Sequence, residues 1–117
     1  MNRIAQNTDL SPLRNKMVEQ VCLSRHQVQL RLESRLYIAI ESKFSFSHEE
    51  LLSEEPDYIS SAHAFALLVE SHINDARVVN DRTVKLVFSN GSSLSIFDSN
   101  DRYESFQIQL PGQLIVV

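Results

Sequence analysis

Residues 83–108 constrain the fold more than any other part of the chain. Apolar side chains alternate with other residues in two runs, 83–88 (TVKLVF) and 92–97 (SSLSIF), on either side of a turn that contains Asn90-Gly91. A period of two places alternate side chains on one face of a sheet, so both runs are predicted to be strands. Because Asn-Gly is the strongest short signal for a β-hairpin, we expect the chain to be built around one here.

The apolar faces of these two strands decide the length of the hairpin loop. A two-residue loop would send Leu94 and Ile96 to the face opposite Leu86, because a shift of one residue exchanges the faces of a strand. A three-residue loop over 89–91 instead pairs Leu86 with Leu94, and Gly91 can then adopt a left-handed conformation without steric cost. The sequence therefore predicts the three-residue loop, with both aliphatic sets on one side of one layer.

A similar alternation occurs upstream, over 28–32 and 36–40. A three-residue loop over 33–35 pairs Leu30 with Ile38 there, although this turn contains no glycine. Two interpretations stay open. The chain is a duplicated unit of two β-meanders, or it holds two ordinary hairpins that share an apolar alternation.

Length and composition favour one globular domain. The 117 residues contain 43% hydrophobic residues, three Pro and two Gly, and they carry a formal net charge of −4. Basic residues are scattered, which argues against binding to nucleic acid or to an anionic membrane, since phosphate neutralisation needs clustered Lys and Arg. The single Cys rules out an internal disulfide and a zinc site built of cysteines. With no long apolar segment and no signal-peptide pattern, we expect a cytoplasmic location.

The remaining segments complete an α+β domain. Residues 1–15 are predicted to be a flexible N-terminal arm, and residues 16–117 a single α+β domain with an acidic insert over 47–59 and a helix over 60–72. An irregular apolar phase near Gln20 indicates a bulge in the first strand. The predicted fold class is therefore α+β: an antiparallel β-sheet of two meanders (six to eight strands), with one main helix packed on one face.

Apolar side chains also predict which surfaces of these segments are buried. In the helix, Phe65, Leu68 and Val69 share one side with Ala62, so this stripe is expected to pack on the sheet. The arm has three apolar residues through which it can dock: Ile4, Leu10 and Leu13. The run 114–117 (LIVV) is apolar at consecutive positions, which predicts a strand covered on both faces.

No constellation of residues predicts a catalytic centre, a cofactor site or a metal site. Cys22 and His26 lack an orienting third group, and His63 and His72 would lie about 180° apart around a helix. Three acids are spaced by three in or beside the loop after the second hairpin: Asp98, Asp101 and Glu104. This spacing suits turns with local side-chain hydrogen bonds, and it also suits a binding edge or a Ca²⁺ or Mg²⁺ ion.

Two surfaces are the candidates for binding a partner. The outer face of the predicted sheet carries a modest apolar patch in a polar field, and the loop after the second hairpin carries acids beside a tyrosine. The residues of these two surfaces are Tyr37, Val87, Phe97, Asp98, Asp101, Tyr103 and Glu104. Aromatic side chains inside a polar rim fit a protein interface, while scattered exposed apolar residues are also normal on a monomer.

The C-terminal half resembles a known group of sequences. It contains FSNG over 88–91, LSIFD over 94–98, YES over 103–105 and IVV over 115–117. This pattern resembles a family of small uncharacterised bacterial proteins, a domain of unknown function, over most of 13–117 outside the acidic insert. The resemblance implies no established activity, although small α+β proteins of this kind are often suspected of neutralising toxins or of binding other partners.

The sequence therefore predicts a non-enzymatic protein-interaction module that forms a homodimer and needs no cofactor. In an immunity-like version, the acidic insert and the 98–104 loop would meet a basic protein partner through complementary charge. The alternative is a small-ligand-binding protein or an enzyme with a site around the 98–104 loop, which requires a concave pocket with convergent polar groups.

Overall fold

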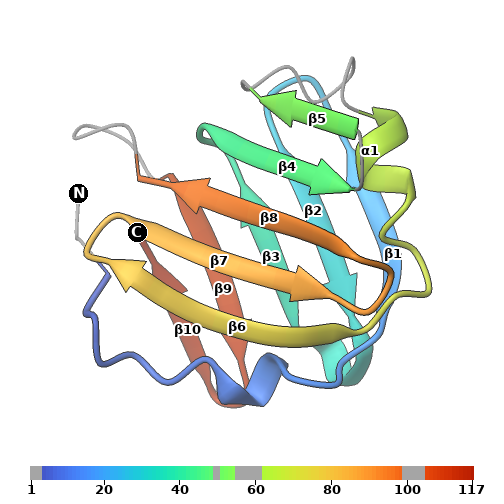
Figure 1. Ribbon diagram of the computed structural model, residues 1–117. Helices are drawn as coiled ribbons and strands as arrows, with labels where there is room; N and C mark the ends of the chain where they lie inside the picture. Colours follow the sequence, from blue (N-terminus) through green and yellow to red (C-terminus); the bar gives the residue numbers. More distant parts are fainter. Residues whose placement is uncertain (1–3, 49–50, 55–61, 99–104) are drawn as a thin grey trace.

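The computed structural model describes residues 4–48, 51–54, 62–98 and 105–117, which form a sandwich of two antiparallel sheets (Figure 1). The first sheet has the order β1-β2-β3-β9-β10 and consists of β1 (Val18–Leu23), β2 (Val28–Leu32), β3 (Tyr37–Ile40), β9 (Phe106–Leu110) and β10 (Gln113–Val116). The second has the order β5-β4-β8-β7-β6 and consists of β4 (Phe44–His48), β5 (Leu51–Glu54), β6 (Ile73–Asn80), β7 (Thr83–Phe88) and β8 (Ser92–Phe97). The described residues also contain three short helical segments: η1 (Ser11–Leu13), η2 (Glu33–Arg35) and α1 (Ala62–Ala66).

The alternating aliphatic side chains of both hairpins face inward and form the core between the sheets. Leu86 pairs with Leu94 across β7 and β8, and Leu30 pairs with Ile38 across β2 and β3. All four side chains are fully buried, and each such burial stabilises the fold by about 1.5–3 kcal/mol. The register that the three-residue loops predict is therefore confirmed, and so is the bulge, which lies between Val18 and Gln20.

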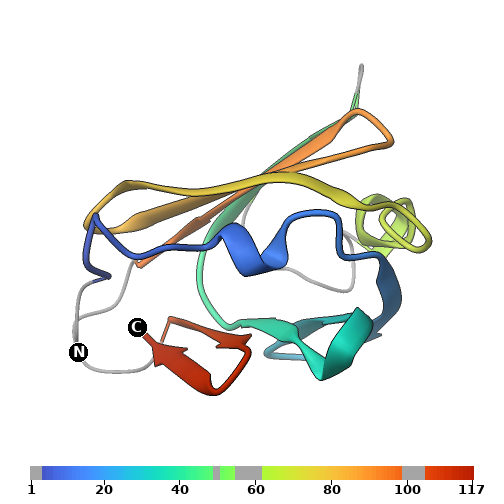
Figure 2. The same ribbon diagram turned by 90° about the horizontal axis from the view of Figure 1, so that it is seen from below.

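The two hairpins lie in different layers, which corrects the prediction of one sheet with six to eight strands. The hairpin β2-β3 belongs to the first sheet and β7-β8 to the second, and the described residues form ten strands in all. Figure 2 shows the two layers edge-on, and the buried apolar side chains of both form one core. Alternation identifies the apolar face of each strand, but such faces can be buried by a helix or by a second sheet. Here a second sheet buries them.

The predicted main helix is short and lies at one end of the sandwich, between the layers (Figure 2). The helix α1 contains five residues, whereas the sequence predicts a helix over 60–72. Its Phe65 is fully buried, with the ring centroid 5.1 Å from that of Phe44 and 6.1 Å from that of Phe46. The helix therefore closes an end of the core and does not cover a face of a sheet.

Backbone bonds to the first sheet end this helix early. The Glu70 N–H donates to the Val18 carbonyl at 2.8 Å, and Glu70 itself has a left-handed φ of 73°. The Ser71 hydroxyl donates to the Leu68 carbonyl at 2.6 Å, and such local side-chain bonds compete with helix formation. The turn leaves Val69 exposed at 42% while Leu68 is fully buried, so the predicted buried stripe is correct for Phe65 and Leu68 and wrong for Val69.

The two halves of the chain repeat the same architecture. Each half contributes a three-stranded meander to one sheet (β1-β2-β3 or β6-β7-β8) and then a hairpin to the other sheet (β4-β5 or β9-β10). The pair Leu30 and Ile38 recurs 56 residues later as Leu86 and Leu94. The bulge after Val18 recurs 55 residues later, after Ile73. The left-handed Asn15 likewise corresponds to Glu70.

Reciprocal hydrogen bonds relate the halves by an approximate two-fold axis at the bridge between Met17 and His72. The Val18 N–H donates to the Ser71 carbonyl at 2.8 Å, and the equivalent Ile73 N–H donates to the Lys16 carbonyl at 3.0 Å. Two unrelated hairpins would share an alternation but not a bulge, a left-handed residue and a reciprocal set of bonds. The structure therefore favours the duplicated unit over two ordinary hairpins.

The N-terminal segment lies along β6. Ile4, Leu10 and Leu13 are buried in the core, and these are the three residues at which the sequence predicts docking. The Ile4 N–H donates to the Asp81 carbonyl at 3.2 Å, and the Arg14 guanidinium pairs with the Asp75 carboxylate at 3.0 Å. The predicted flexibility of residues 1–15 stays a prediction.

The predicted acidic insert overlaps two strands. Its residues 47–48 end β4, and residues 51–54 form β5. The rest of the insert, 49–50 and 55–59, lies outside the described residues.

Truncation of Phe65 tests the end-of-core position of the helix. The Phe65→Ala variant is expected to lose about 3–5 kcal/mol of unfolding free energy, because it opens a cavity against Phe44 and Phe46. The Val69→Ala variant, which truncates an exposed side chain, is expected to stay within about 0.5 kcal/mol of the parent protein. Urea denaturation measures both values, and a costly Val69→Ala change would contradict the described helix end.

Candidate functional site

The structure separates the residues of the predicted apolar patch. Tyr37 lies on the outer face of the first sheet, whereas Val87 and Phe97 lie on the outer face of the second, on the other side of the sandwich. Within that second face, Val87 is paired with Ser93 while Phe97 is paired with Thr83 at the other end of the hairpin. The three side chains therefore do not form one patch. The predicted patch was wrong because the prediction placed both hairpins in a single layer, whereas they lie in two.

Asp98 is a buried structural residue. It is 3% exposed, and its Oδ1 accepts a hydrogen bond of 2.8 Å from the Ser105 hydroxyl. Its N–H donates to the Arg82 carbonyl at 2.7 Å, and the Arg82 guanidinium donates to the Asp98 carbonyl at 3.3 Å. These bonds hold the point where the chain leaves β8 for the other sheet. The other predicted members of this site, Asp101, Tyr103 and Glu104, lie outside the described residues.

The described residues contain no group of three or more His, Cys, Asp or Glu side chains that could hold a metal ion. Cys22 is half-buried in β1 opposite Gln29, and His26 is exposed in the turn that follows. No helix within the described ranges is long and apolar enough to cross a membrane.

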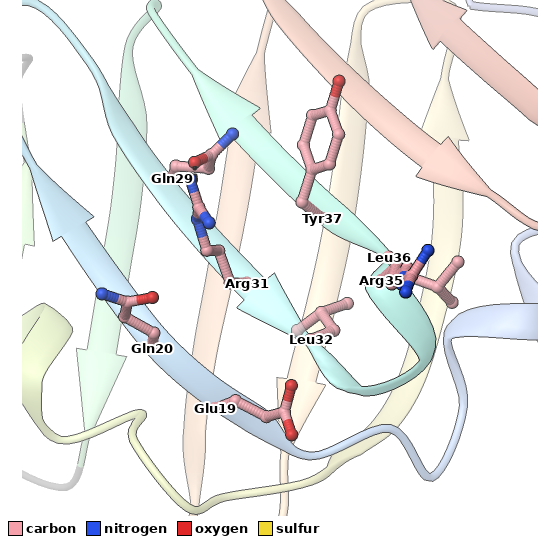
Figure 3. Close-up of a pocket in the computed structure, with 8 residues that line it drawn as sticks. All are labelled: Glu19, Gln20, Gln29, Arg31, Leu32, Arg35, Leu36 and Tyr37. Atoms are coloured by element: carbon pink, nitrogen blue, oxygen red, sulfur yellow. Dashed lines mark hydrogen bonds between the residues drawn. The ribbon is translucent and has the colours of Figure 1, made fainter.

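A pocket of about 450 Å³ opens on the outer face of the first sheet (Figure 3). One row of paired residues crosses it, in which Gln20 on β1 pairs with Arg31 on β2 and Arg31 pairs with Tyr37 on β3. The bulge in β1 turns Glu19 outward beside Gln20, and the turn after β2 brings in Arg35. The complete lining is Glu19, Gln20, Gln29, Arg31, Leu32, Arg35, Leu36 and Tyr37.

The polar groups of the pocket are largely unengaged. Arg31 donates through Nε to the Gln29 side-chain oxygen at 3.0 Å. This bond orients the guanidinium and leaves its two terminal amino groups available to a ligand. Within the described part of the chain, the Arg35 guanidinium, the Glu19 carboxylate and the Tyr37 hydroxyl make no hydrogen bond or ion pair. The pocket therefore presents two guanidinium groups against one carboxylate.

The turn that carries Arg35 is strained. Ser34 and Arg35 both have a φ of 63°, in the left-handed region. This conformation costs a residue with a side chain about 1–2 kcal/mol relative to the right-handed one. The equivalent turn in the second half has a glycine, Gly91, with a φ of 92° at the position of Arg35.

The strand β10 ends the first sheet on the side opposite β1, and its exposure corrects another prediction. Among the described residues β10 pairs only with β9, and Leu114 is 48% exposed. The apolar run 114–117 predicts a strand covered on both faces, but only Ile115 and Val117 pack on the core. Leu114 and Val116 point to the outer face, because successive side chains of a strand alternate.

Sequence reasoning found part of the pocket. Because the predicted register turns Leu30 and Ile38 to the inner face, it places their neighbours Gln29, Arg31 and Tyr37 on the outer face, and the structure confirms this. It missed Glu19 and Arg35, because a bulge turns the first outward and a left-handed turn positions the second. The irregular phase near Gln20 was the one available signal for Glu19.

A family model described as "Family of unknown function (DUF6188)" matches residues 9–117. This match confirms the resemblance to an uncharacterised domain family, while the particular motif and a bacterial source stay predictions. No curated protein and no solved structure matches the chain.

A double-mutant cycle on Asp98 and Ser105 tests the structural role of the buried carboxylate. Each single change to Ala is expected to cost about 1–3 kcal/mol of unfolding free energy, because it leaves a buried polar partner unsatisfied. The double variant should lose less unfolding free energy than the two single variants together, by at least about 0.5 kcal/mol, since each single change already breaks the same bond. Urea unfolding of the four proteins measures the cycle, and an Asp98→Ala variant of unchanged stability would contradict this role.

Proposed function

We propose that this chain, which belongs to the DUF6188 family of unknown function, is a non-enzymatic protein-interaction module that self-associates through the free edge of β10. The observation that carries the proposal is an exposed, uncharged edge strand with outward-facing backbone groups. The absence of catalysis and a cytoplasmic location are parts of the same proposal.

The hydrogen-bonding pattern defines which backbone groups of β10 face outward. The Val117 N–H donates to the Phe106 carbonyl at 3.0 Å, and the Phe106 N–H donates back at 3.4 Å. In an antiparallel ladder such doubly bonded pairs alternate with pairs that share no bond. The peptide groups of Leu114 and Val116 therefore point away from β9, along the free edge.

The edge of β10 lacks the usual protection against pairing with another chain. Exposed edges are normally blunted by charged side chains, by bulges or by proline within the strand. Residues 113–117 contain none of these, and Pro111 precedes the strand in its turn. The exposed Leu114 adds apolar surface at the same place.

A second copy of the chain is the partner that fits this edge. Antiparallel pairing of two β10 strands about Ile115 would set Leu114 of each copy beside Val116 of the other, so the contact is self-complementary under a two-fold axis. It would form about four backbone hydrogen bonds and join two first sheets into one. Because such a contact is small, we expect weak association, with a Kd on the order of 10⁻⁴ M.

The basic protein partner and the small-ligand or enzyme site around 98–104 stay proposals of second rank. Asp98 is engaged with Ser105, and the other residues of that loop lie outside the described ranges.

Charge at the edge tests the proposed dimer. The parent protein is expected to dimerise in sedimentation equilibrium as its concentration approaches about 1 mM. Leu114→Lys is expected to remain monomeric because it places a charge beside the apolar Val116 of the other copy and brings two like charges into diagonal positions across the contact. Val116→Pro should also abolish dimers, since it removes an outward N–H that β9 does not use.

Val79→Lys is the matched control. Val79 is an exposed valine of β6, at 50% against 48% for Leu114, and it lies in the other sheet. This variant should dimerise like the parent protein, and thermal unfolding should show that all three variants fold. A parent protein that stays monomeric at the highest concentration, or an unchanged dimer in Leu114→Lys, would refute the proposal.

A further inference from the structure

We propose that the pocket on the outer face of the first sheet binds a small organic anion, whose apolar body lies against Tyr37 and whose carboxylate or phosphate group is attracted by Arg31 and Arg35, which lie on either side of that ring (Figure 3). This inference is independent of self-association through β10. It rests on the unneutralised charge of the pocket, on the strained turn and on the comparison between the two halves of the chain.

The charge of the pocket favours an oxyanion. Two guanidinium groups face one carboxylate, Glu19, and no described residue forms an ion pair with either arginine. Arginine binds carboxylate and phosphate through paired N–H donors, and the bond from Arg31 to Gln29 already fixes the orientation of one of them. The pocket thus supplies the terminal N–H donors of Arg31, held in place by Gln29, and those of Arg35, and these donors have no acceptor among the described residues.

The size and the remaining lining favour a small ligand with an apolar part. A volume of about 450 Å³ lies within the range of small-molecule sites. Leu32 and Leu36 border the pocket, but their side chains are buried in the core, so the apolar surface open to a ligand is mainly the half-buried Tyr37 ring, which rises from β3 beside Arg31 (Figure 3). Gln20 and the Tyr37 hydroxyl add hydrogen-bonding groups to the same pocket.

The repeat shows which pocket residues the fold itself does not require. The position of Arg35 corresponds to Gly91 in the second half, where glycine adopts the left-handed conformation without strain. The first half keeps an arginine there despite that strain. Strained backbone that persists in one place is typical of functional sites.

The other pocket residues also have no counterpart in the second half. The equivalent of Arg31 is Val87, and the equivalent of Tyr37 is Ser93, because both pairs occupy the same register 56 residues apart. The two guanidinium groups are therefore a property of the first half alone. The first half therefore carries the site on a framework that both halves share.

Substitutions copied from the second half test the site. The probes are phenyl phosphate, benzoate and inorganic phosphate. Each is titrated into the full chain, and its binding is measured from the changes in backbone amide chemical shifts. Saturable shifts confined to residues 19–20 and 29–37 are expected with at least one aromatic probe. Arg35→Gly and Arg31→Val should each weaken that binding at least about tenfold.

Arg35→Gly has a second expected effect that a merely structural arginine would not show. This variant should unfold at a higher temperature than the parent protein, because glycine relieves the left-handed strain. Arg77→Ala is the control, because it removes an exposed arginine from β6 in the other sheet. It should have the melting temperature and the probe affinity of the parent protein.

The pattern of binding identifies the anionic group. Binding of phenyl phosphate alone assigns a phosphate ligand, and binding of benzoate alone assigns a carboxylate, while inorganic phosphate should bind more weakly than phenyl phosphate. The proposal is overturned if neither aromatic probe saturates the parent protein, if Arg35→Gly and Arg31→Val bind as the parent does, or if Arg35→Gly is no more stable.

Discussion

The short antiparallel contact between the starts of β1 and β6 holds the two sheets together. These strands would otherwise be edges of separate layers, but the Met17 and His72 bridge joins them, and Val18 and Ile73 donate across it in both directions. Each half then sends its following hairpin into the opposite sheet. Because the rings of Phe44 and Phe46 from one half surround Phe65 from the other, neither half has a complete core of its own.

This arrangement explains why the inner faces of the halves repeat while the outer faces differ. Inward positions must fill a densely packed core, so Leu30 and its equivalent Leu86 stay alike. Outward positions carry no such packing constraint, so Arg31 can stand in one half where Val87 stands in the other. A shared framework can therefore hold a polar pocket on one outer face and a plain serine-rich face on the other.

The sequence predicted the parts of the fold that depend on side-chain alternation. The need to place the apolar residues of both strands on one face was enough to predict the three-residue loop that pairs Leu86 with Leu94, because a register shifted by one residue would have exposed a whole apolar face. It could not say that the hairpins occupy different layers, since an inward face is apolar in both arrangements. The helix end was missed because the backbone bond from Glu70 to Val18 comes from a segment far away in the sequence.

The candidate site was less accessible to sequence reasoning than the fold. Asp98 looked like a surface acid, and only its bond to Ser105 shows that it is buried to fix the crossing between sheets. Arg35 gave no signal at all, because a left-handed arginine cannot be recognised without backbone angles or the comparison with Gly91. The exposed edge at Leu114 was hidden by an apolar run that is also typical of a covered strand.

Native-state hydrogen exchange at the Val18 and Ile73 amides tests most directly whether the reciprocal contact holds the halves as one unit. If it does, both amides exchange only through global unfolding, with equal protection that matches the free energy from denaturation. Protection of either amide roughly tenfold below the global value, or clearly unequal protection of the two, would show that the contact opens locally and would contradict this account.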